Sequence, residues 1–571
     1  MSPKTVTPLI ALVALIGSLR ARLNPSVTSR KVLGGVALAF ASWALPALAE
    51  AVVAVDCSNP KHTISSRVNS PGIVIVVRGT CTENVVITSD DVTITTDGVS
   101  PATISALDTS QPTIRLDGAH RIRIDGVTPG GLTISGGTYG ILASRGSTLD
   151  LSNCTVAGNS QNGVVASYSS TLSVDSCTVG PNTGNGVGAS NTASLAITNS
   201  TVTNNTAAGV FAVRSSFVRV GQDLAGTPIA KPVTVSGSGG NGIAISESSA
   251  GSVVGGVVEN SGATQLFVGR GSSGQIGLGS NNLTGGVTIR NGASHGISVE
   301  GGNATIVFST ITSNASTGIL ISNAGSARIG LLNGVGSGAT RVSSNGSVGI
   351  HVAIGASAFI GGTTIDGNGT DPGAGLGRFG IQVFQGSVTL AGNNVITNNA
   401  NTGIFVAQGG RVLVGDGAFG LGTTNTISSN GNGGIFAFQG GIISARNATI
   451  SDNTGAAVQA FEAGVVELFG STAVTVPAVG STPGAVVQFG STLQLSQTAS
   501  IISATGDGIQ TSNLTAISIG NGNTVQGNGA GGVGVRCFSS PPLTASAVTL
   551  TGNLSNVTGA TGTFVGCNVF Q

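Results

Sequence analysis

The chain has 571 residues, of which 92 are glycine and only 8% are charged, about a third of the usual share of charged residues in globular proteins. Its 23 Lys and Arg residues balance 22 Asp and Glu residues, and no basic cluster appears, so the sequence lacks the electrostatic footprint of a nucleic-acid-binding protein. This composition requires a fold that buries small and β-branched side chains many times over.

Residues 1–49 are predicted to be a cleaved export signal. Two basic residues precede an apolar run over residues 32–45, and residues 46–49 (PALA) supply a cleavage site with small residues. The apolar run is shorter than the roughly 20 residues that a membrane-spanning helix needs. We therefore expect an exported protein, periplasmic, extracellular or on the cell surface, that does not insert into a membrane after cleavage.

The true start of translation is a separate question, because Met1 is the only methionine in the chain. We hypothesise that translation begins near Val27 on a non-ATG codon, which would make residues 1–26 an artefact of start-site assignment. Removal of residues 1–49, with their five basic and no acidic residues, leaves 18 basic and 22 acidic residues, a net charge of −4.

A spaced pattern recurs through most of the remaining chain: an apolar residue, Asn three positions later, Gly four positions after that, and then Ile or Val. It begins at Val156, Val179, Val202, Ile311, Val342, Ile396, Ile427 and Val525. The glycines at 140, 163, 186 and 209 are 23 residues apart, and later intervals are 22 to 24 or about eight residues longer. The first and third positions after each Gly are apolar, which is typical of a strand with one buried face.

A unit of 23 residues holds about three short strands, too few to bury its own apolar face, so successive units must stack as in solenoid proteins. The recurring Asn tolerates left-handed backbone geometry, and its amide can bond to the same amide one unit away. We interpret these asparagines as a ladder at a turn rather than as a binding site.

This register resembles that of the right-handed parallel β-helix repeat proteins of the pectate-lyase-like superfamily, over about residues 100–560. The resemblance implies an all-β chain that forms a single right-handed parallel β-helix with three strands per coil. We expect an N-terminal cap and the first coils over residues 50–110, the β-helix over residues 111–535, and a C-terminal cap over residues 536–571.

Four coils contain insertions after an Ile-Gly or Val-Gly step. The steps are Val220-Gly221, Ile276-Gly277, Ile329-Gly330 and Val414-Gly415. The inserted segments are rich in Gly, Asn and Thr, which predicts loops along one edge of the stack.

The six cysteines fall into three local pairs: Cys57 with Cys81, Cys154 with Cys177, and Cys537 with Cys567. The middle pair is one repeat apart, which places its Cα atoms about 4.8 Å from each other on adjacent coils, within reach of a disulfide. An export signal supplies an oxidising compartment, so we predict three disulfides, the outer two closing the ends of the helix. No His or Cys-x-x-Cys spacing supports a metal site.

Relatives of this fold include polysaccharide lyases, hydrolases and epimerases, whose activity requires carboxylates clustered with Arg, Lys, His or calcium on one outer sheet. No such set is assembled in this sequence. Asp90-Asp91 is interpreted as a polar strand entry, and His351 and Glu300 are expected to lie too far apart for an acid–base pair. We predict no catalytic residue, no metal and no cofactor.

Phenylalanines recur in the outward-facing columns of the C-terminal coils. Counted from the recurring Gly position of each coil, the fourth position is assigned to Phe384, Phe438, Phe461 and Phe489, and the second to Phe405 and Phe436. Adjacent exposed phenylalanines normally mark a covered or binding surface. Either an insertion or the tail after Cys537 packs over this stripe, or the stripe binds an extended partner. Since Phe lacks the polar handle of Trp and Tyr, a protein partner or self-association is favoured over a glycan.

The sequence therefore favours a secreted or cell-surface scaffold over an enzyme. The scaffold is expected to hold an extended partner, a polysaccharide or a surface protein, on this stripe and its edge loops. The alternative is a carbohydrate-active enzyme, a polysaccharide lyase, hydrolase or epimerase, with a divergent site.

Overall fold

The computed structural model describes residues 51–571 except residues 60, 228–229, 331–338, 375–376, 416–423, 478–481, 513, 529–531, 539–548, 553–556, 560–561 and 566–571. The chain divides into two units, Met1–Glu50 and Ala51–Gln571. The predicted export signal lies outside the described residues, and all that follows concerns the second unit.

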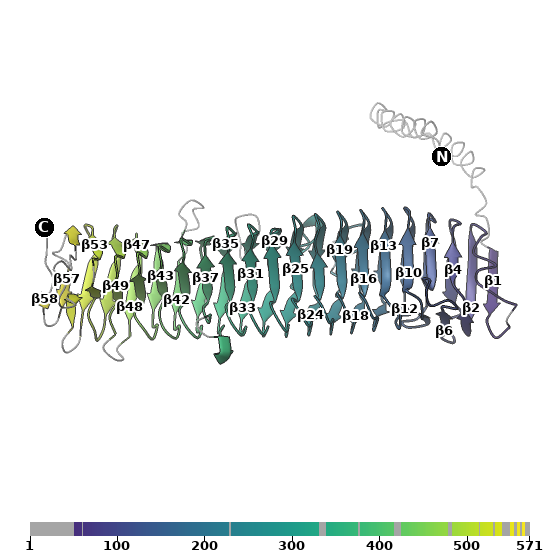
Figure 1. Cartoon of the computed structure of the whole chain (residues 1–571), viewed down its shortest axis with the longest axis horizontal. Helices are drawn as coiled ribbons and strands as arrows, with labels where there is room; N and C mark the ends of the chain where they lie inside the picture. Colours follow the sequence, from purple (N-terminus) through teal and green to yellow (C-terminus); the bar gives the residue numbers. More distant parts are fainter. Residues whose placement is uncertain are drawn as a thin grey trace, which may run out of the picture. The chain divides into compact units, whose positions relative to one another are not determined.

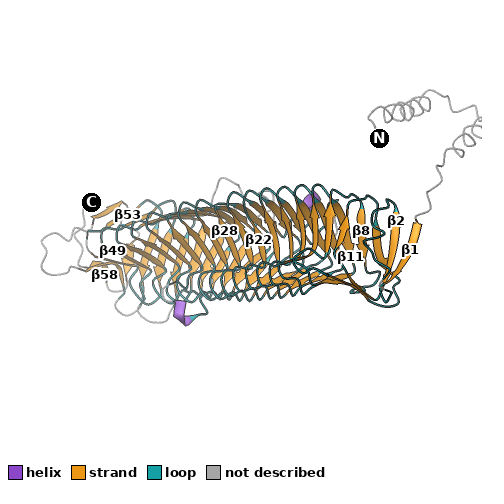
Figure 2. Ribbon diagram, turned by 45° about the vertical axis from the view of Figure 1, so that its right-hand side comes forward, coloured by secondary structure: helices purple, strands orange, loops and turns teal. Residues whose placement is uncertain are grey.

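The second unit is a stack of coils that runs from β1 (Ala51–Asp56) to β58 (Gly562–Val565), with three short strands in each coil (Figures 1 and 2). Each strand pairs in parallel with the equivalent strand of the next coil, which produces three long sheets: the 20-stranded sheet A and two further sheets, B and C. The predicted all-β fold with three strands per coil is confirmed. Among the described residues, no helix has the length and apolar character needed to cross a membrane.

Two of the sheets position the surfaces considered below. In sheet A the relevant strands are β20 (Phe217–Val220), β23 (Ala250–Val253), β26 (Ser273–Ile276), β29 (Asn303–Ile306), β32 (Ser326–Ile329), β35 (Ser357–Gly361), β38 (Ser387–Ala391), β41 (Arg411–Val414) and β44 (Ile442–Arg446). In sheet C they are β22 (Ile243–Ile245), β25 (Leu266–Gly269), β28 (Ile297–Glu300), β31 (Ile319–Ser322), β34 (Ile350–Ala353), β37 (Ile381–Phe384), β40 (Ile404–Ala407), β43 (Ile435–Phe438), β46 (Val458–Phe461) and β49 (Ala485–Gln488).

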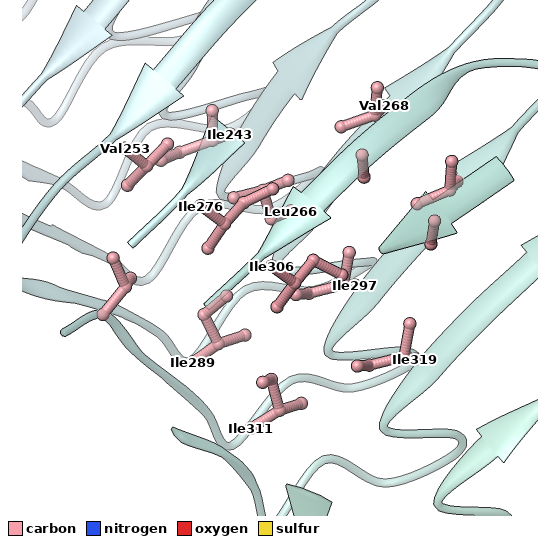
Figure 3. Packing of buried hydrophobic residues seen from close by; sticks show 14 of the residues in the cluster. Ile243, Val253, Leu266, Val268, Ile276, Ile289, Ile297, Ile306, Ile311 and Ile319 are labelled. Carbon is pink, nitrogen blue, oxygen red and sulfur yellow. The ribbon is translucent and has the colours of Figure 1, made fainter. Parts of the chain in front are cut away.

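The core is a set of columns in which like side chains stack on like. Ile381 pairs with Ile404, and Ile404 pairs with Ile435; all three side chains are completely buried. Figure 3 shows the same stacking further toward the N-terminus, where Ile297 and Ile319 from sheet C face Ile306 from sheet A. Each such side chain contributes about 1.5–3 kcal/mol of burial free energy, which explains how a chain with so few charges forms a stable fold.

The predicted asparagine ladder is confirmed at the turn that follows sheet B. In the N-terminal run, the amide of Asn159 donates to Asn182, which donates to Asn205. A second run joins Asn314, Asn345, Asn368, Asn399, Asn430 and Asn453 in the same way, with N···O distances of 2.9–3.0 Å. In the three coils between the runs, Ser238, Ser261 and Gly292 occupy this position, and the hydroxyls of the two serines have no hydrogen-bond partner among the described residues.

The turn after each sheet C strand begins with a residue in the left-handed region. In five successive coils this residue is Gln385, Gln408, Gln439, Glu462 and Phe489, with φ between 45° and 56°. Each of these side chains is exposed at the rim of the sheet.

The first two predicted insertions pack against each other. Gln222, in the loop after β20, receives a hydrogen bond from the backbone of Ser280 (3.0 Å), in the short 3₁₀ helix η2 (Ser280–Asn282) after β26. Asn281 in turn donates to the carbonyl of Gly226 at 2.8 Å. The third and fourth insertions fall on residues 331–338 and 416–423, outside the described residues. A further insertion, which the sequence interpretation missed, lies between β36 (Thr363–Asp366) and β37 and contains η3 (Pro372–Ala374).

Of the three predicted disulfides, the one between Cys57 and Cys81 is confirmed, with a Cα–Cα distance of 5.0 Å. Cys537 is disulfide-bonded, and Cys567 lies outside the described residues. The prediction for Cys154 and Cys177 requires correction.

Cys154 and Cys177 are stacked on adjacent coils as the spacing predicted, but both are free and buried thiols. The backbone N–H of Cys154 donates to the sulfur of Cys177 at 3.4 Å, and each sulfur donates to a nearby carbonyl, at Ser152 and Asp175. The thiols therefore satisfy local hydrogen bonds in place of a covalent link.

Candidate functional site

The phenylalanine stripe lies on the outer face of sheet C and forms one wall of a hollow of about 430 Å³, which we call the phenylalanine groove. The groove is lined by five phenylalanines, five amide side chains and two small residues: Phe379, Phe384, Phe405, Phe436, Phe438, Gln382, Asn401, Gln408, Asn432, Gln439, Gly377 and Ala407. Among the described residues, no charged side chain lines it.

Strand register brings the phenylalanines of separate coils together. Phe405 of β40 is paired directly with Phe436 of β43, and Phe438 of β43 with Phe461 of β46. Both columns face outward because the residues between them, such as Val406 and Ala437, are fully buried. The predicted outward placement of these four phenylalanines is therefore what the structure shows.

The rings pack edge to face along the stack. The centroids of Phe405 and Phe436 are 5.2 Å apart with an interplanar angle of 70°, and those of Phe436 and Phe461 are 5.3 Å apart at 74°. Phe384 contacts Phe405 in the same manner at 5.8 Å. Such pairs add about 0.5–1.5 kcal/mol each beyond the area that they bury, so the half-buried rings form a continuous and ordered apolar surface.

Phe489 lies one position further along its coil than the sequence assigned it. The pairing of Ala460 with Val487 places Gln488, not Phe489, in the column of Phe461. Ala485 follows its partner Val458 by 485 − 458 = 27 residues, against 23 in most coils, and this longer interval moved the assigned repeat position by one residue. Phe489 instead begins the turn with φ 56°, is 52% exposed, and approaches Phe461 to 6.4 Å.

The sequence interpretation missed Phe379, which immediately precedes Gly380 at a regular position of the coil, where its carbonyl accepts from the N–H of Gly349 as that of Gly433 accepts from Gly403. Its ring stacks on Phe405 with a centroid distance of 4.5 Å and an interplanar angle of 7°, and it is 4% exposed. Phe379 therefore covers one face of Phe405 from a regular position of the coil and not as part of an insertion. The available signal was a Phe immediately before the recurring Gly at position 380.

Two histidines and a glutamate lie near the N-terminal end of the groove. The His351 ring makes an edge contact with Phe384 at 5.6 Å, and burial, with His295 as a second cause, lowers the pKa of His351 to about 4. Burial also lowers the pKa of His295, while nearby Glu300 opposes that shift. Among the described residues, neither His295 Nδ1 nor His351 Nε2 has a hydrogen-bond partner.

The acidic pairs of the N-terminal coils have structural partners. Asp91 forms an ion pair with Arg121 of the next coil, and hydrogen bonding from Arg121 lowers the pKa of Asp91. The predicted interpretation of Asp90-Asp91 as a polar strand entry agrees with this placement. Cys57, Cys81 and Glu83 lie within 4.8 Å of one another, but the disulfide leaves no thiolate there to hold a metal ion.

The chain belongs to the family described as "Right handed beta helix region", whose profile matches residues 63–225 and 276–464, more than half of the chain. The right-handed coil and the resemblance inferred from the repeat are confirmed. No curated protein matches the chain.

Solved structures with a similar fold include two from Azotobacter vinelandii. The A-module of mannuronan C-5 epimerase AlgE4 is 14% identical, with 56% of this chain and 86% of that chain covered and a TM-score of 0.33. The A-module of mannuronan C-5 epimerase AlgE6 is 15% identical, with coverage of 82% and 91% and a TM-score of 0.21. The Dettilon tailspike protein (gp208) is 13% identical, with coverage of 74% and 62% and a TM-score of 0.23.

Proposed function

We propose that this protein is an exported binding scaffold that holds an extended, uncharged polysaccharide in the phenylalanine groove. The observation that carries the proposal is the lining of the groove, in which phenylalanines alternate with amides and no charged side chain is present. The disulfide between Cys57 and Cys81 supports export, because stable disulfides form in oxidising compartments.

The amides supply the polar handle that phenylalanine lacks. Asn401 and Asn432 precede strands β40 and β43, whereas Gln408 and Gln439 follow them, so amides stand at both ends of the aromatic strip. A sugar presents C–H groups that pack on aromatic rings and hydroxyls that bond to amides as donors and acceptors. The amides therefore favour a glycan over a protein as the partner of this groove.

The repeat of the coils favours a partner that also repeats. Equivalent positions recur about every 4.8 Å along the stack, and Phe405 with Gln408 in one coil is matched by Phe436 with Gln439 in the next. A linear chain laid along the stack would meet the same pair of groups at each coil.

The experiment that tests this proposal is affinity electrophoresis of the protein in gels that contain uncharged β-glucans, xylans or mannans. The wild-type protein should be retarded by at least one of them, and the double variant Phe438→Ser with Phe461→Ser should lose the retardation. The matched control is Phe267→Ser, because Phe267 is a half-buried residue of the same sheet face that lies outside the groove.

Three outcomes contradict the proposal. Retention of binding in the double variant places the site elsewhere. A loss of self-association in sedimentation experiments, with no polysaccharide bound by the wild type, identifies the stripe as a protein interface. A sharp fall in melting temperature of the double variant, without bound polysaccharide in the wild type, identifies it as packing.

A carbohydrate-active enzyme is the second candidate, and the pair His295 and His351 beside the groove favours it. Both imidazoles are mostly buried, and each has a ring nitrogen without a hydrogen-bond partner among the described residues. Glu300, which accepts a hydrogen bond from Ser298 at 2.7 Å, lies in the same region of sheet C and is the carboxylate of this set. Incubation with the polysaccharide that binds should then release reducing ends or unsaturated products, and His351→Asn should abolish that release while binding persists.

A further inference from the structure

One amide of the phenylalanine groove is both buried and without a partner. Gln382 of β37 lines the groove and is 8% exposed, and its side chain forms no hydrogen bond with the described residues. Buried polar groups are normally hydrogen-bonded, and a few such groups in an apolar cleft fix the orientation of a ligand. The state of Gln382 therefore indicates that a ligand of the groove supplies its missing hydrogen bonds.

A second glutamine in the same outward column of sheet C shows what Gln382 lacks. The residues of this column, paired in register, are Gln382, Phe405, Phe436 and Gln459. Gln459 is 9% exposed, but its amide donates at 3.2 Å to the carbonyl of Ala456, three residues earlier. The corresponding carbonyl before Gln382 is that of Phe379, which accepts from the N–H of Gly349 in the neighbouring coil. Gln382 has no bond of the kind that Gln459 makes, and its amide stays available to the groove.

Aromatic rings surround the position of Gln382. In register it pairs with Phe405 in the next coil and with His351 in the previous one. Phe379 stacks face to face on Phe405 at 4.5 Å, and Phe384, on the same outward face of β37 as Gln382, meets Phe405 edge to face at 5.8 Å. A ligand group that bonds to Gln382 must therefore lie against these rings, which favours a group that is polar at one end and apolar at the other.

Every other polar side chain of the groove lining is also a primary amide. These amides are Asn401, Gln408, Asn432 and Gln439, and among the described residues no hydroxyl, imidazole or carboxylate lines the groove beside them. A primary amide offers N–H donors and a carbonyl acceptor. The asparagine ladder of the same protein shows that amides on successive coils bond well to one another, at 2.9–3.0 Å. An amide carried by a ligand along the stack would find partners at the same spacing.

An acetamido group meets these requirements better than a hydroxyl does. Its planar trans amide presents the N–H on one side and the carbonyl on the other, so it can accept from one amide of the groove and donate to another. Its methyl group adds apolar surface that phenylalanine rings can bury. A ring hydroxyl ends next to the sugar ring, whereas the carbonyl and methyl of an acetamido group extend further and can reach a residue as buried as Gln382.

The two ends of the groove differ in the state of their amides. The strands that line it, β37, β40 and β43, belong to three successive coils, which span about 10 Å along the stack. Gln382, in the first of these coils, is buried and unpaired, whereas Gln439, in the last, is exposed and donates to Glu462 at 3.1 Å. The N-terminal end of the groove is therefore the end at which a ligand amide gains a buried partner.

We infer that the neutral polysaccharide of the phenylalanine groove is an N-acetylated one, a polymer of N-acetylhexosamine units, and that Gln382 determines this specificity. Gln382 donates a hydrogen bond to the acetyl carbonyl of one unit, the acetyl methyl packs on the rings of Phe384 and Phe405, and the acetamido N–H donates to an exposed amide of the groove. This inference rests on the proposed function, because it assigns the chemical class of the chain held at the same site.

Three soluble polymers that share one linear backbone test the inference. Glycol chitin is uncharged and carries acetamido groups, hydroxyethyl cellulose is uncharged and lacks them, and glycol chitosan carries free amines in their place. In affinity electrophoresis the wild-type protein should bind glycol chitin about tenfold more tightly than either of the others, the value of one hydrogen bond to an otherwise unpaired buried group. Hydroxyethyl cellulose should still bind weakly, through the rings of the groove alone.

The variant Gln382→Leu tests the residue itself. Leu is similar to Gln in size, and the amide that it removes bonds to no described residue, so the melting temperature should not fall. Binding of glycol chitin should weaken by about tenfold, while binding of hydroxyethyl cellulose stays at the wild-type level. Gln494→Leu, at a half-buried outward position of β50 (Thr492–Leu495) in sheet A, is the matched control and should leave the binding of both polymers unchanged.

The inference is wrong if the wild type binds hydroxyethyl cellulose or glycol chitosan as tightly as glycol chitin, a comparison that needs no variant. It is also wrong if Gln382→Leu weakens both neutral polymers equally or weakens neither. Where the acetyl preference fails but the double variant Phe438→Ser with Phe461→Ser still loses hydroxyethyl cellulose, the proposed function stands and only the N-acetylated class is refuted. If the wild type binds no neutral polymer at all, the inference and the proposed function fail together.

Discussion

Replacing one rung of the asparagine ladder should be among the most destabilising polar substitutions in this chain. Asn399 is 1% exposed, and its side chain takes part in four hydrogen bonds. Its amide donates to Asn430 at 3.0 Å and to the carbonyl of Ile365 at 3.2 Å. Its oxygen accepts from the amide and from the backbone N–H of Asn368, at 3.0 and 3.1 Å.

The size of the effect follows from what Asn399→Ala leaves unpaired. Four hydrogen bonds at about 1 kcal/mol each are lost, and the buried backbone N–H of Asn368 keeps no partner, which costs about 1–3 kcal/mol on the scale for buried unsatisfied groups. We expect a loss of about 5–7 kcal/mol in the free energy of unfolding, a large part of the 5–15 kcal/mol typical of a folded protein.

Urea unfolding followed by circular dichroism measures this loss, provided that the slope of the transition is unchanged. Asn432→Ala is the matched control, because Asn432 is exposed and its side chain makes no hydrogen bond with the described residues. The control should shift stability by no more than about 0.5 kcal/mol. If Asn399→Ala costs less than about 1 kcal/mol, or no more than the control, the ladder does not stabilise the coils as argued.

Three further outcomes are expected. A hydrogen bond with Cys177, together with burial, raises the pKa of Cys154 well above its ordinary range, and both thiols are buried. Neither should react with a thiol reagent at pH 8 until denaturant is added, and no release of thiols in denaturant would show that they are oxidised. Gly274→Val should lower stability by about 1–3 kcal/mol through overpacking against Val268, whereas the same change at the exposed neighbour Ser273 should not. Because the pKa of folded His351 is about 4, below its ordinary value near 6.5, the unfolded chain binds more protons between these values; stability should fall as pH drops from about 6.5 to about 4, and His351→Phe should remove that part of the pH dependence in a series of melting curves.

The parts of the structure that depend on register within one repeat could be predicted from the sequence. The spacing of Val156, Asn159 and Gly163 fixes a strand, a turn and the next strand, and its recurrence requires stacking, so the coil and the ladder both follow. The outward placement of Phe405 and Phe436 follows from the same count. Phe489 was assigned one position too early because Ala485 follows its partner Val458 by 27 residues rather than 23. A position counted from the previous repeat does not include such extra residues.

Features that arise between coils could not be read in this way. The hollow of about 620 Å³ on the outer face of sheet A is lined by residues of seven separate coils, from Phe217 of β20 to Thr389 of β38. No one coil carries that signal. Phe379 stands at a regular position, immediately before Gly380, but its stacking on Phe405 depends on the ring of the next coil. The free thiols of Cys154 and Cys177 show a related limit: spacing gives proximity, but not the chemical state of the two sulfurs.

The asparagine ladder consists of two runs of amide-to-amide bonds, separated by three coils that have no asparagine at this position. Coils joined by amide-to-amide bonds, from Asn159 to Asn205 and from Asn314 to Asn453, should open together, because loss of one rung unpairs its neighbours. The coils of Ser238, Ser261 and Gly292 lack amide-to-amide bonds, and the two interlocked insertions join them instead, through the hydrogen bonds of Gln222 with Ser280 and of Asn281 with Gly226. In a repeat protein, stability is a sum of local and nearest-neighbour terms, so these insertions supply coupling between coils at the place where the ladder does not.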